Sequence, residues 1–288
     1  MLTRDGGAPT CVRVALVHPT ARPRLAVIDL VSTRLQDLLV SSSRTLVTMH
    51  ADAATGHLGG NLSCLPGLLA IVDRLEPNDR LVLSKGHSAG ALYVALASKG
   101  LIPPEQLATF YHDGTMLPGH PPVNAFDAIP FATGSLGHGL SLAAGLALAN
   151  KLRGTENKVF CLTSDGEWQE GSTWEALIFA SHHELRNLVI LVDHNGWQAL
   201  GRTSEVASMS PLWERVRGFP IDTSVIDGDD IETVATELDR PTQRLRIIFL
   251  ETTKGRGIAS IADTLLSHYF VVKDGDLEMA LEELGTQE

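Results

Sequence analysis

Two polar segments, each following a short apolar run, hold the residue types best suited to chemistry. Asp165 and Gly166 follow the run at 159–162, and Asn195 follows the run at 188–192. If these runs are neighbouring parallel strands, their carboxyl ends meet at the edge where doubly wound folds bind ligands. A carboxylate and a carboxamide suit a hard cation such as Mg²⁺, which takes its remaining oxygens from phosphate and water. Asp165-Gly166 or Asn195-Gly196 alone is typical of a turn after a strand, but the two dipeptides together predict a metal site.

The hydrophobic pattern predicts the elements that position these residues. Continuous apolar runs at 159–162, 188–192 and 245–250 indicate parallel strands buried on both faces. Between the first two runs lies a helical pattern whose apolar side is formed by Trp174, Leu177, Ile178 and Leu185. The strand, helix and strand form a crossover, and its repetition predicts an α/β fold with a doubly wound, mostly parallel sheet flanked by helices.

The two ends of the chain depart from this pattern. Apolar residues recur at helical spacing from Leu35 until about Gly56, which predicts a long helix ending in a histidine-containing loop. Residues 1–28 carry prolines and a pair of glycines and are expected to form an extended or partly ordered N-terminal arm. We therefore expect one functional domain over residues 29–288, with an acidic helix around residues 276–284.

Composition excludes several classes of protein. The chain has 288 residues and a formal net charge of −11, without a long basic run, which argues against a nucleic-acid surface. Its three cysteines form no CxxC motif, as expected in a reducing compartment. No secretory leader and no stretch of about 20 apolar residues is visible, so we expect a cytoplasmic protein that does not enter a membrane.

A glycine-rich stretch at residues 133–139 leads into a helix of small residues. A loop that opens a helix can offer backbone N–H groups and the helix dipole to an anion. The stretch is not a P-loop, because no Gly-Lys-Ser/Thr follows it. The acidic stretch 227–230 lacks residues that a calcium loop requires and is expected to be a turn and helix cap.

Six ordered motifs together resemble the transketolase family from about residue 30 to residue 285. They are Gly56-His57-Leu58-Gly59-Gly60-Asn61-Leu62-Ser63, Leu83-Ser84-Lys85-Gly86-His87-Ser88, Gly119-His120-Pro121, Thr133-Gly134-Ser135-Leu136-Gly137-His138-Gly139, Asp165-Gly166-Glu167 with Glu170-Gly171 and Asp193-His194-Asn195, and Lys254-Gly255-Arg256-Gly257. The resemblance implies the thiamine-diphosphate-binding fold of that family. The first motif is also similar to 1-deoxyxylulose-5-phosphate synthases, whereas the second and fifth favour transketolase.

The resemblance implies a binding site for thiamine diphosphate and Mg²⁺, or Ca²⁺ or Mn²⁺ in its place. Metal ligands would be Asp165, Asn195 and the backbone carbonyl of Trp197, with Gly166 beside the cofactor. The other implied cofactor residues are Gly134 and Leu136 at the aminopyrimidine, and His87 and His268 at the diphosphate.

The resemblance also implies the substrate side of the site. His57, His120 and His268 would face a ketose donor, and Glu170 would reach across a dimer interface. Removing a proton from a donor hydroxyl near neutral pH suits imidazole, which can act as base or acid. The other histidines outside these motifs are expected to be core or surface residues: His18, His50, His112, His182, His183 and His194.

The chain resembles about the first half of a complete transketolase. In the family, the glutamate that activates the cofactor comes from the pyrimidine-binding domain, which follows the resembling half. The resemblance therefore implies the N-terminal subunit of a split, two-component transketolase. A separate C-terminal subunit would carry the pyrimidine-binding domain, and the assembly would be an α2β2 heterotetramer.

Three functions stay open on the sequence alone. The first is transfer of a two-carbon ketol unit from a ketose or 2-oxo donor to an aldehyde. The second passes the same unit to the thiol of a carrier protein in a biosynthetic pathway. The third is an inactive scaffold or regulatory partner, against which the intact Asp165, Asn195, His57, His87 and His120 argue.

Overall fold

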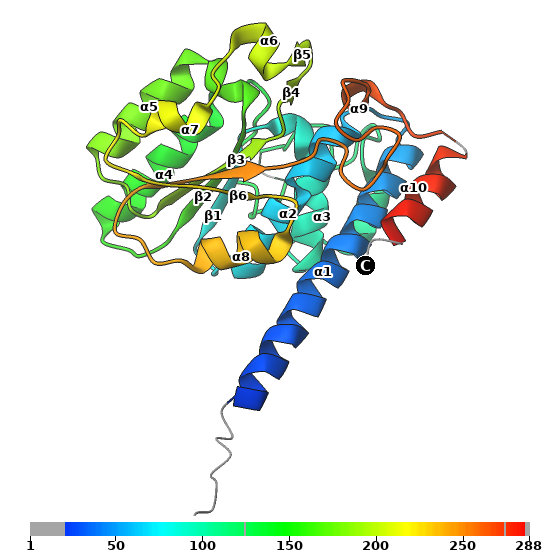
Figure 1. The fold of residues 1–288 in the computed structure, drawn as a ribbon, viewed down its shortest axis with the longest axis horizontal. Coiled ribbons are helices and arrows are strands. Elements are labelled where there is room, and N and C mark those ends of the chain that lie inside the picture. Colours follow the sequence, from blue (N-terminus) through cyan, green and yellow to red (C-terminus); the bar gives the residue numbers. More distant parts are fainter. Residues whose placement is uncertain (1–20, 124, 274, 286–288) are drawn as a thin grey trace, which may run out of the picture.

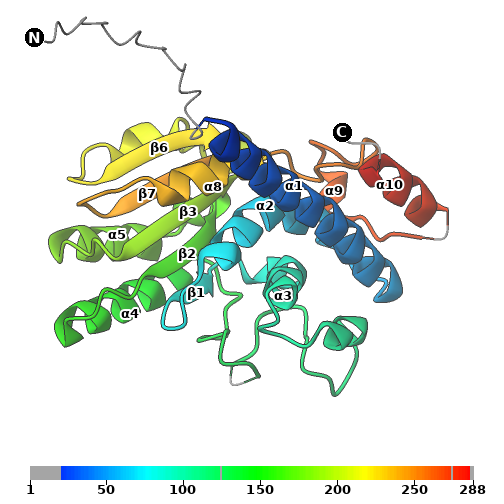
Figure 2. The same ribbon diagram turned by 90° about the horizontal axis from the view of Figure 1, so that it is seen from below.

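Five parallel strands form the central sheet of the protein (Figures 1 and 2). The structure is a computed structural model that describes residues 21–123, 125–273 and 275–285, with side chains from Arg34 onward. The strands lie in the order β1-β2-β3-β7-β6 and comprise β1 (Arg80–Leu83), β2 (Val159–Ser164), β3 (Leu188–His194), β7 (Arg246–Glu251) and β6 (Asp222–Asp227). The predicted fold class and its three central strands are confirmed.

Helices cover both faces of the sheet (Figure 2). One face packs against α1 (Ala21–Asp52), α2 (Leu58–Arg74), α3 (Ala89–Ser98) and α8 (Ile231–Asp239). The other face packs against α4 (Gly139–Arg153), α5 (Gly171–His182) and α7 (Leu212–Val216). The remaining elements are the hairpin β4 (Trp197–Gln198) and β5 (Gly201–Arg202), α6 (Thr203–Ala207), α9 (Leu266–Tyr269), α10 (Asp276–Gly285) and the 3₁₀ turns Gly86–Ser88, Pro104–Thr109 and Gly166–Gln169.

Each central strand contributes to both hydrophobic cores. In β2, Phe160 and Leu162 enter the core under α1, α2, α3 and α8, while Val159 and Cys161 enter the core under α4, α5 and α7. Successive side chains of a strand point to opposite faces, so a strand covered on both sides must be apolar throughout. The sandwiched sheet presents its carboxyl-terminal edge as a rigid platform for loops.

The start of the first helix and the buried side of α5 differ from the sequence predictions. Helix α1 begins at Ala21, before the predicted start at Leu35. Residues 1–20 of the predicted arm lie outside the described part of the chain, so the domain boundary stays a prediction. The helical pattern places Ile178 on the buried side, but this residue is 56% exposed, and Leu185 is buried beyond the end of α5.

The sequence pattern did not reveal strands β1 and β6. Strand β1 has only four residues, and β6 is mostly polar and has no buried residue at the sheet edge. The expected small-residue helix, the Asp230 cap of α8 and the acidic C-terminal helix are all present as α4, α8 and α10. None of the described helices is both long enough and apolar enough to cross a membrane.

Candidate functional site

Asp165 and Asn195 emerge at the same edge of the sheet, as the sequence predicts. Strand β2 pairs in parallel with β3, so the segments after both strands lie side by side. The Asp165 carboxylate accepts hydrogen bonds from the backbone N–H groups of Gly166 (2.8 Å) and Gly196 (2.7 Å), and Gly196 directly follows Asn195. Burial raises the pKa of Asp165 to about 6. The crossover therefore brings the predicted carboxylate and carboxamide to one place.

A buried carboxylate fixes the orientation of the Asn195 side chain. Asn195 Nδ2 donates to Asp193 Oδ2 at 3.0 Å and lies 3.2 Å from Ser63 Oγ. Asn195 Oδ1 accepts a hydrogen bond from the backbone N–H of Trp197 at 3.0 Å. Because a carboxylate accepts and never donates, Asp193 selects the amide nitrogen and leaves the amide oxygen on the side of Trp197. That oxygen is the atom a metal would need.

Asp193 is the centre of a network that the sequence did not reveal. Its carboxylate is fully buried and accepts hydrogen bonds from Ser63 Oγ (2.7 Å), Asn195 and Thr252 Oγ1, and it forms an ion pair with Lys85. Burial alone lowers the pKa of Lys85, but Asp193 raises it on balance. The network joins α2, the loop after β1 and the ends of β3 and β7.

Asp193→Asn is expected to lower the free energy of unfolding by about 3–5 kcal/mol, because it leaves the buried Lys85 ammonium without its counter-charge. Urea denaturation of the chain measures this loss. Asp239 offers the matched control, since its pair with Arg74 lies at the surface and Asp239 is 63% exposed. Asp239→Asn should cost at most about 1 kcal/mol. Equal losses in the two variants would contradict a buried pair at Asp193.

Three predicted histidines form a cluster in front of this edge. The ring centroid of His57 lies 4.7 Å from that of His268 and 5.7 Å from that of His87. The backbone N–H of His57 donates to the His268 carbonyl at 3.0 Å, which ties the start of α2 to α9. Burial and nearby positive charges lower the pKa values of all three, that of His268 to about 4. The imidazoles are therefore neutral near pH 7 and available as proton acceptors.

Two adjoining cavities share this histidine cluster and His120. The first has a volume of about 390 Å³ and is lined by these predicted site residues: His57, His87, His120, Gly134, Leu136, Gly166, Asn195, Trp197 and His268. The second, of about 300 Å³, continues past the four histidines to Phe110 and Tyr111. The fold thus gathers segments from along the whole domain around one continuous space.

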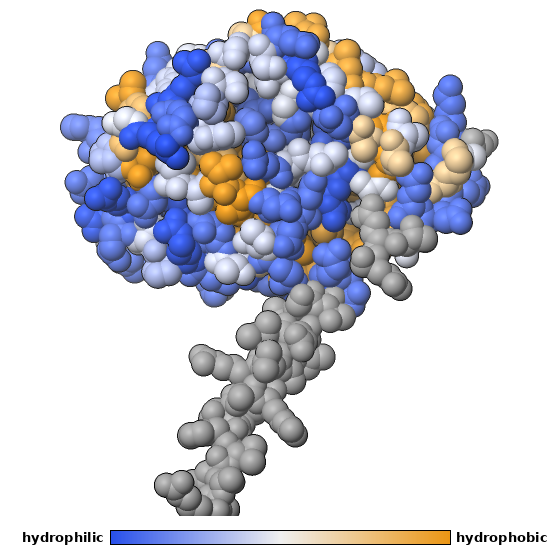
Figure 3. Space-filling model, viewed as in Figure 1, coloured by the Kyte–Doolittle hydropathy of each residue, from blue (hydrophilic) through white to orange (hydrophobic). Residues whose placement is uncertain are grey.

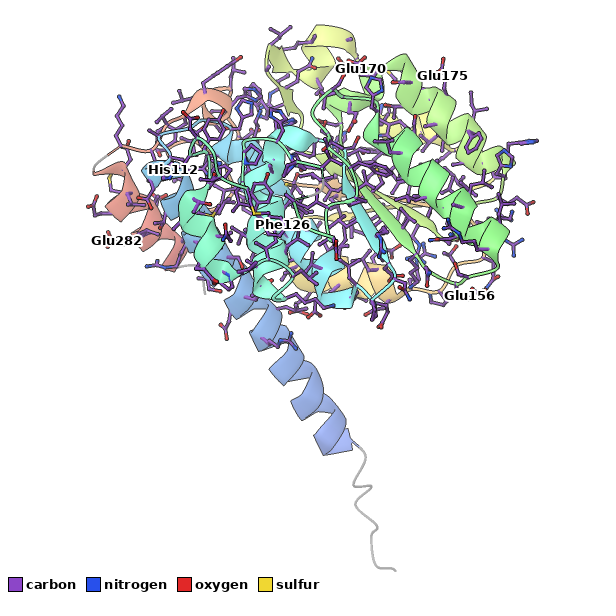
Figure 4. All side chains as sticks on the ribbon, turned by 180° about the vertical axis from the view of Figure 1, so that it is seen from behind. His112, Phe126, Glu156, Glu170, Glu175 and Glu282 are labelled. Atoms are coloured by element: carbon purple, nitrogen blue, oxygen red, sulfur yellow. The ribbon has the colours of Figure 1, made fainter. Side chains whose placement is uncertain are left out.

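Two predicted residues lie outside these cavities. Asp165 lines a neighbouring cavity of about 170 Å³, with its carboxylate engaged by backbone N–H groups. Glu170 is exposed at the start of α5, and Figure 4 shows it at the same outer edge of the molecule as Glu175. Its predicted role across a dimer interface is not tested by one chain and stays a prediction.

The glycine-rich loop binds a carboxylate of the protein itself. Glu167 is fully buried and accepts hydrogen bonds from the backbone N–H groups of Gly137 (2.7 Å) and Ser164 (3.3 Å) and from Ser84 Oγ. The Gly137 amide is therefore occupied by this carboxylate, while the predicted cofactor contacts of Gly134 and Leu136 stay a prediction. Gly137 has a φ of +84°, a backbone conformation that favours glycine. Glu167 anchors this loop against the ends of β1 and β2.

Two lysines that sequence reasoning left without a role also line the larger cavity. Lys85 and Lys254 both lie near the histidine cluster, and Lys254 Nζ is 3.2 Å from His268 Nδ1. Burial and the Lys85 charge lower the pKa of Lys254 to about 8, which leaves it mostly protonated at pH 7. Their only sequence signal was their position inside two of the motifs. Asp193 compensates the charge of Lys85, so the local positive charge comes from Lys254, and in a chain of net charge −11 it suits an anionic ligand.

The cavity also fits a hard cation held partly by that anion. Among the described residues, no group of three or more His, Cys, Asp or Glu side chains is arranged to hold a metal. The available metal ligands are instead the Asn195 amide oxygen and backbone carbonyls in this cavity and the Asp165 carboxylate in the neighbouring one, a set that matches Mg²⁺ completed by phosphate oxygens. Gln198 lines the same cavity as Asn195 and Trp197, and its Nε2 is buried without a hydrogen-bond partner in the described part of the chain. An unpaired buried donor is what a site built for an anion leaves when its ligand is absent.

The chain is similar to known proteins of one family. The family described as "Transketolase, thiamine diphosphate binding domain" matches residues 72–288. The chain is 37% identical over 254 residues to an Actinobacillus succinogenes protein named as one of the subunits of apulose-4-phosphate transketolase, covering 84% of this chain and 92% of that protein. It is 38% identical over 242 residues to the Clostridium protein named 6-deoxy-6-sulfo-D-fructose transketolase subunit SqwG, covering 80% and 88%.

Solved structures agree with these relatives. The transketolase from Campylobacter jejuni superposes with a TM-score of 0.78 at 27% identity over 86% of this chain and 43% of that one. For the transketolase from Pichia stipitis the TM-score is 0.81 at 27% identity, over 87% and 40%. The chain thus spans less than half of these transketolases but about nine tenths of the two relatives named as subunits. On this combined ground of sequence, fold and site, the chain belongs to the transketolase family.

Proposed function

We propose that this chain is the N-terminal component of a two-component transketolase, which moves a two-carbon ketol unit from a ketose or 2-oxo donor to an aldehyde. The observation that carries the proposal is the shared cavity, in which neutral imidazoles, two lysines and Asn195 meet, with Asp165 in the cavity next to it. Relatives named as separate transketolase subunits, aligned over nearly their full length, support the two-component form.

In this proposal the larger cavity holds thiamine diphosphate and Mg²⁺. Asp165, Asn195 Oδ1 and the Trp197 carbonyl are the protein's metal ligands, and Gly166 lies beside the diphosphate. The diphosphate is bound by side chains with positive charge or N–H groups, namely Lys85, His87, Lys254 and His268, while Gly134 and Leu136 line the aminopyrimidine. When bound, the cofactor supplies the electron sink for cleaving a carbon–carbon bond.

The second cavity is the proposed donor site. His57, His120 and His268 face it, and the lowered pKa values of His57 and His268 keep those imidazoles unprotonated near pH 7. A neutral imidazole accepts a proton from a donor hydroxyl and returns it to the product, which suits bond cleavage at neutral pH. The aromatic residues Phe110 and Tyr111 also line this cavity.

The proposed partner is a separate subunit with the pyrimidine-binding domain, which supplies the activating glutamate. Exposed apolar side chains lie on the hairpin, α6 and α9: Leu200 at 80%, Leu266 and Tyr269 at 56%, and Val206 at 42%, and of these Leu200 and Tyr269 line the cavities. Figure 3 shows hydrophobic residues along this upper edge, over the hairpin, α6 and α9 of Figure 1. Such a surface supports coverage by a partner subunit. We further propose an α2β2 assembly in the cytoplasm, with Glu170 at the interface. Transfer to a carrier-protein thiol and a scaffold role are not favoured.

We expect the chain alone to show no ketol transfer and to gain it when mixed with the product of an adjoining pyrimidine-domain coding sequence. Assays contain thiamine diphosphate and Mg²⁺, and the donor panel begins with the two sugars in the relatives' names, apulose 4-phosphate and 6-deoxy-6-sulfo-D-fructose. Steady turnover of a ketose by the chain alone would overturn the two-component proposal. Light scattering of the co-purified pair tests the heterotetramer.

A further inference from the structure

Gln198, a residue in the wall of the proposed cofactor cavity, carries an unpaired hydrogen-bond donor. Its Nε2 is buried, and it has no hydrogen-bond partner in the described part of the chain. Gln198 lines the larger cavity together with Gly166, Asn195 and Trp197. Its Oε1 would lie only 3.3 Å from a Cβ placed on Gly166, so the amide sits against the segment that follows Asp165. Buried amides are normally paired, and one left unpaired within a cavity indicates a missing acceptor.

The backbone of Gln198 is held in place by several contacts. Gln198 pairs with Gly201 in the two-stranded hairpin. On one side of it, the Trp197 indole donates to Asp263 at 2.7 Å. On the other side, the Tyr269 hydroxyl donates to the Ala199 carbonyl at 2.7 Å. The hairpin is thus tied to the segment around α9, and the backbone that carries the Gln198 side chain has a fixed place in the cavity wall.

We propose that Gln198 is a further cofactor-binding residue, whose Nε2–H donates a hydrogen bond to a diphosphate oxygen of thiamine diphosphate. This rests on the proposed function, because the acceptor belongs to the proposed cofactor. The diphosphate is the group that matches the position, since Gln198 lies beside Gly166 and Asn195 at the metal end of the cavity. It is also the strongest acceptor available, because hydrogen bonds to charged oxygens are about twice as strong as neutral ones.

The proposal separates the stability of the ligand-free chain from its affinity for cofactor. Gln198→Met keeps the size of the side chain and removes the unpaired donor, so the melting temperature of the ligand-free chain should stay the same or rise. The dissociation constant for thiamine diphosphate with Mg²⁺, measured by calorimetric titration, should increase by about 10- to 100-fold. Binding of thiamine, which lacks the diphosphate, should not change. Gln198→Glu should weaken thiamine diphosphate binding further, because it adds a negative charge.

Gln169 provides the matched control. Its Nε2 donates to the carbonyls of Thr203 (3.2 Å) and Ala207 (2.9 Å), so it is a glutamine whose amide is already paired. Gln169→Met should lower the melting temperature and leave the affinity for thiamine diphosphate unchanged. Wild-type affinity in Gln198→Met, or a fall in its ligand-free melting temperature like that of Gln169→Met, would overturn the proposal. All titrations use the chain assembled with its partner subunit, and if the assembled wild-type enzyme fails to bind thiamine diphosphate, the proposed function fails instead.

Discussion

Asp165→Ala is expected to reduce the affinity for thiamine diphosphate and Mg²⁺ by roughly 100-fold or more, with activity falling in parallel. The reason is that Asp165 supplies the only side-chain carboxylate among the proposed metal ligands. A small hard cation depends on charged oxygen, and without it the diphosphate loses the ion that neutralises it. Calorimetric titration of the cofactor, with Mg²⁺ present, measures the effect directly.

The structure requires a second variant to interpret this result. Asp165 accepts hydrogen bonds from the backbone N–H groups of Gly166 and Gly196, so alanine also leaves two donors unpaired. Asp165→Asn removes the charge but keeps an oxygen acceptor and the side-chain size. Circular dichroism should show an intact fold in Asp165→Asn together with severe loss of cofactor binding. Wild-type cofactor affinity in this variant would mean that the metal site lies elsewhere.

Asn195→Ala should weaken cofactor binding less than the Asp165 variants, because it deletes a neutral ligand that water can partly replace. Asn195→Ala also removes a hydrogen bond from the Asp193 network, so its folding must be checked separately. The two ligands thus differ in kind. Asp165 contributes charge to the metal, whereas Asn195 contributes an oxygen whose direction Asp193 fixes.

The juxtaposition of Asp165 and Asn195 could be predicted because it depends on rules that act along the chain. Strands buried on both faces are apolar throughout, and parallel neighbours end at the same edge. Neither rule applies to strand β6, which lies at the edge of the sheet, is mostly polar and has no buried residue. A pattern search for buried strands therefore finds the centre of such a sheet and misses its margins.

The ion pair between Lys85 and Asp193 could not be predicted, because nothing local marks either residue as buried. Lysine and aspartate are usually exposed, and these two are 1% and 0% exposed only because α2, β1 and β3 come together around them. The Gln198 donor was missed for the same reason. Its lack of a partner is a property of the folded cavity and leaves no trace in the residue order.

His120→Ala is expected to slow donor cleavage by roughly 10²- to 10⁴-fold while leaving cofactor affinity unchanged. His120 lines both cavities, and its imidazole lies against Gly134, where an added Cβ would be 2.8 Å from the His120 ring. That position places it where the proposed donor meets the cofactor. Unlike His57, His87 and His268, it is exposed, so its removal creates no buried void.

The control for this variant is His112, an exposed histidine on the same long loop that lines neither cavity and is labelled in Figure 4. His112→Ala should retain wild-type turnover, because it removes an equal imidazole from the loop without removing a group from the donor site. Single-turnover kinetics of the assembled enzyme measure donor cleavage, and titration of thiamine diphosphate measures the cofactor side separately. If His120→Ala lost cofactor affinity as severely as it lost cleavage rate, His120 would belong to the cofactor site and not to the donor site. A similar loss of rate in both variants would show that the loop as a whole, rather than the His120 imidazole, is what cleavage requires.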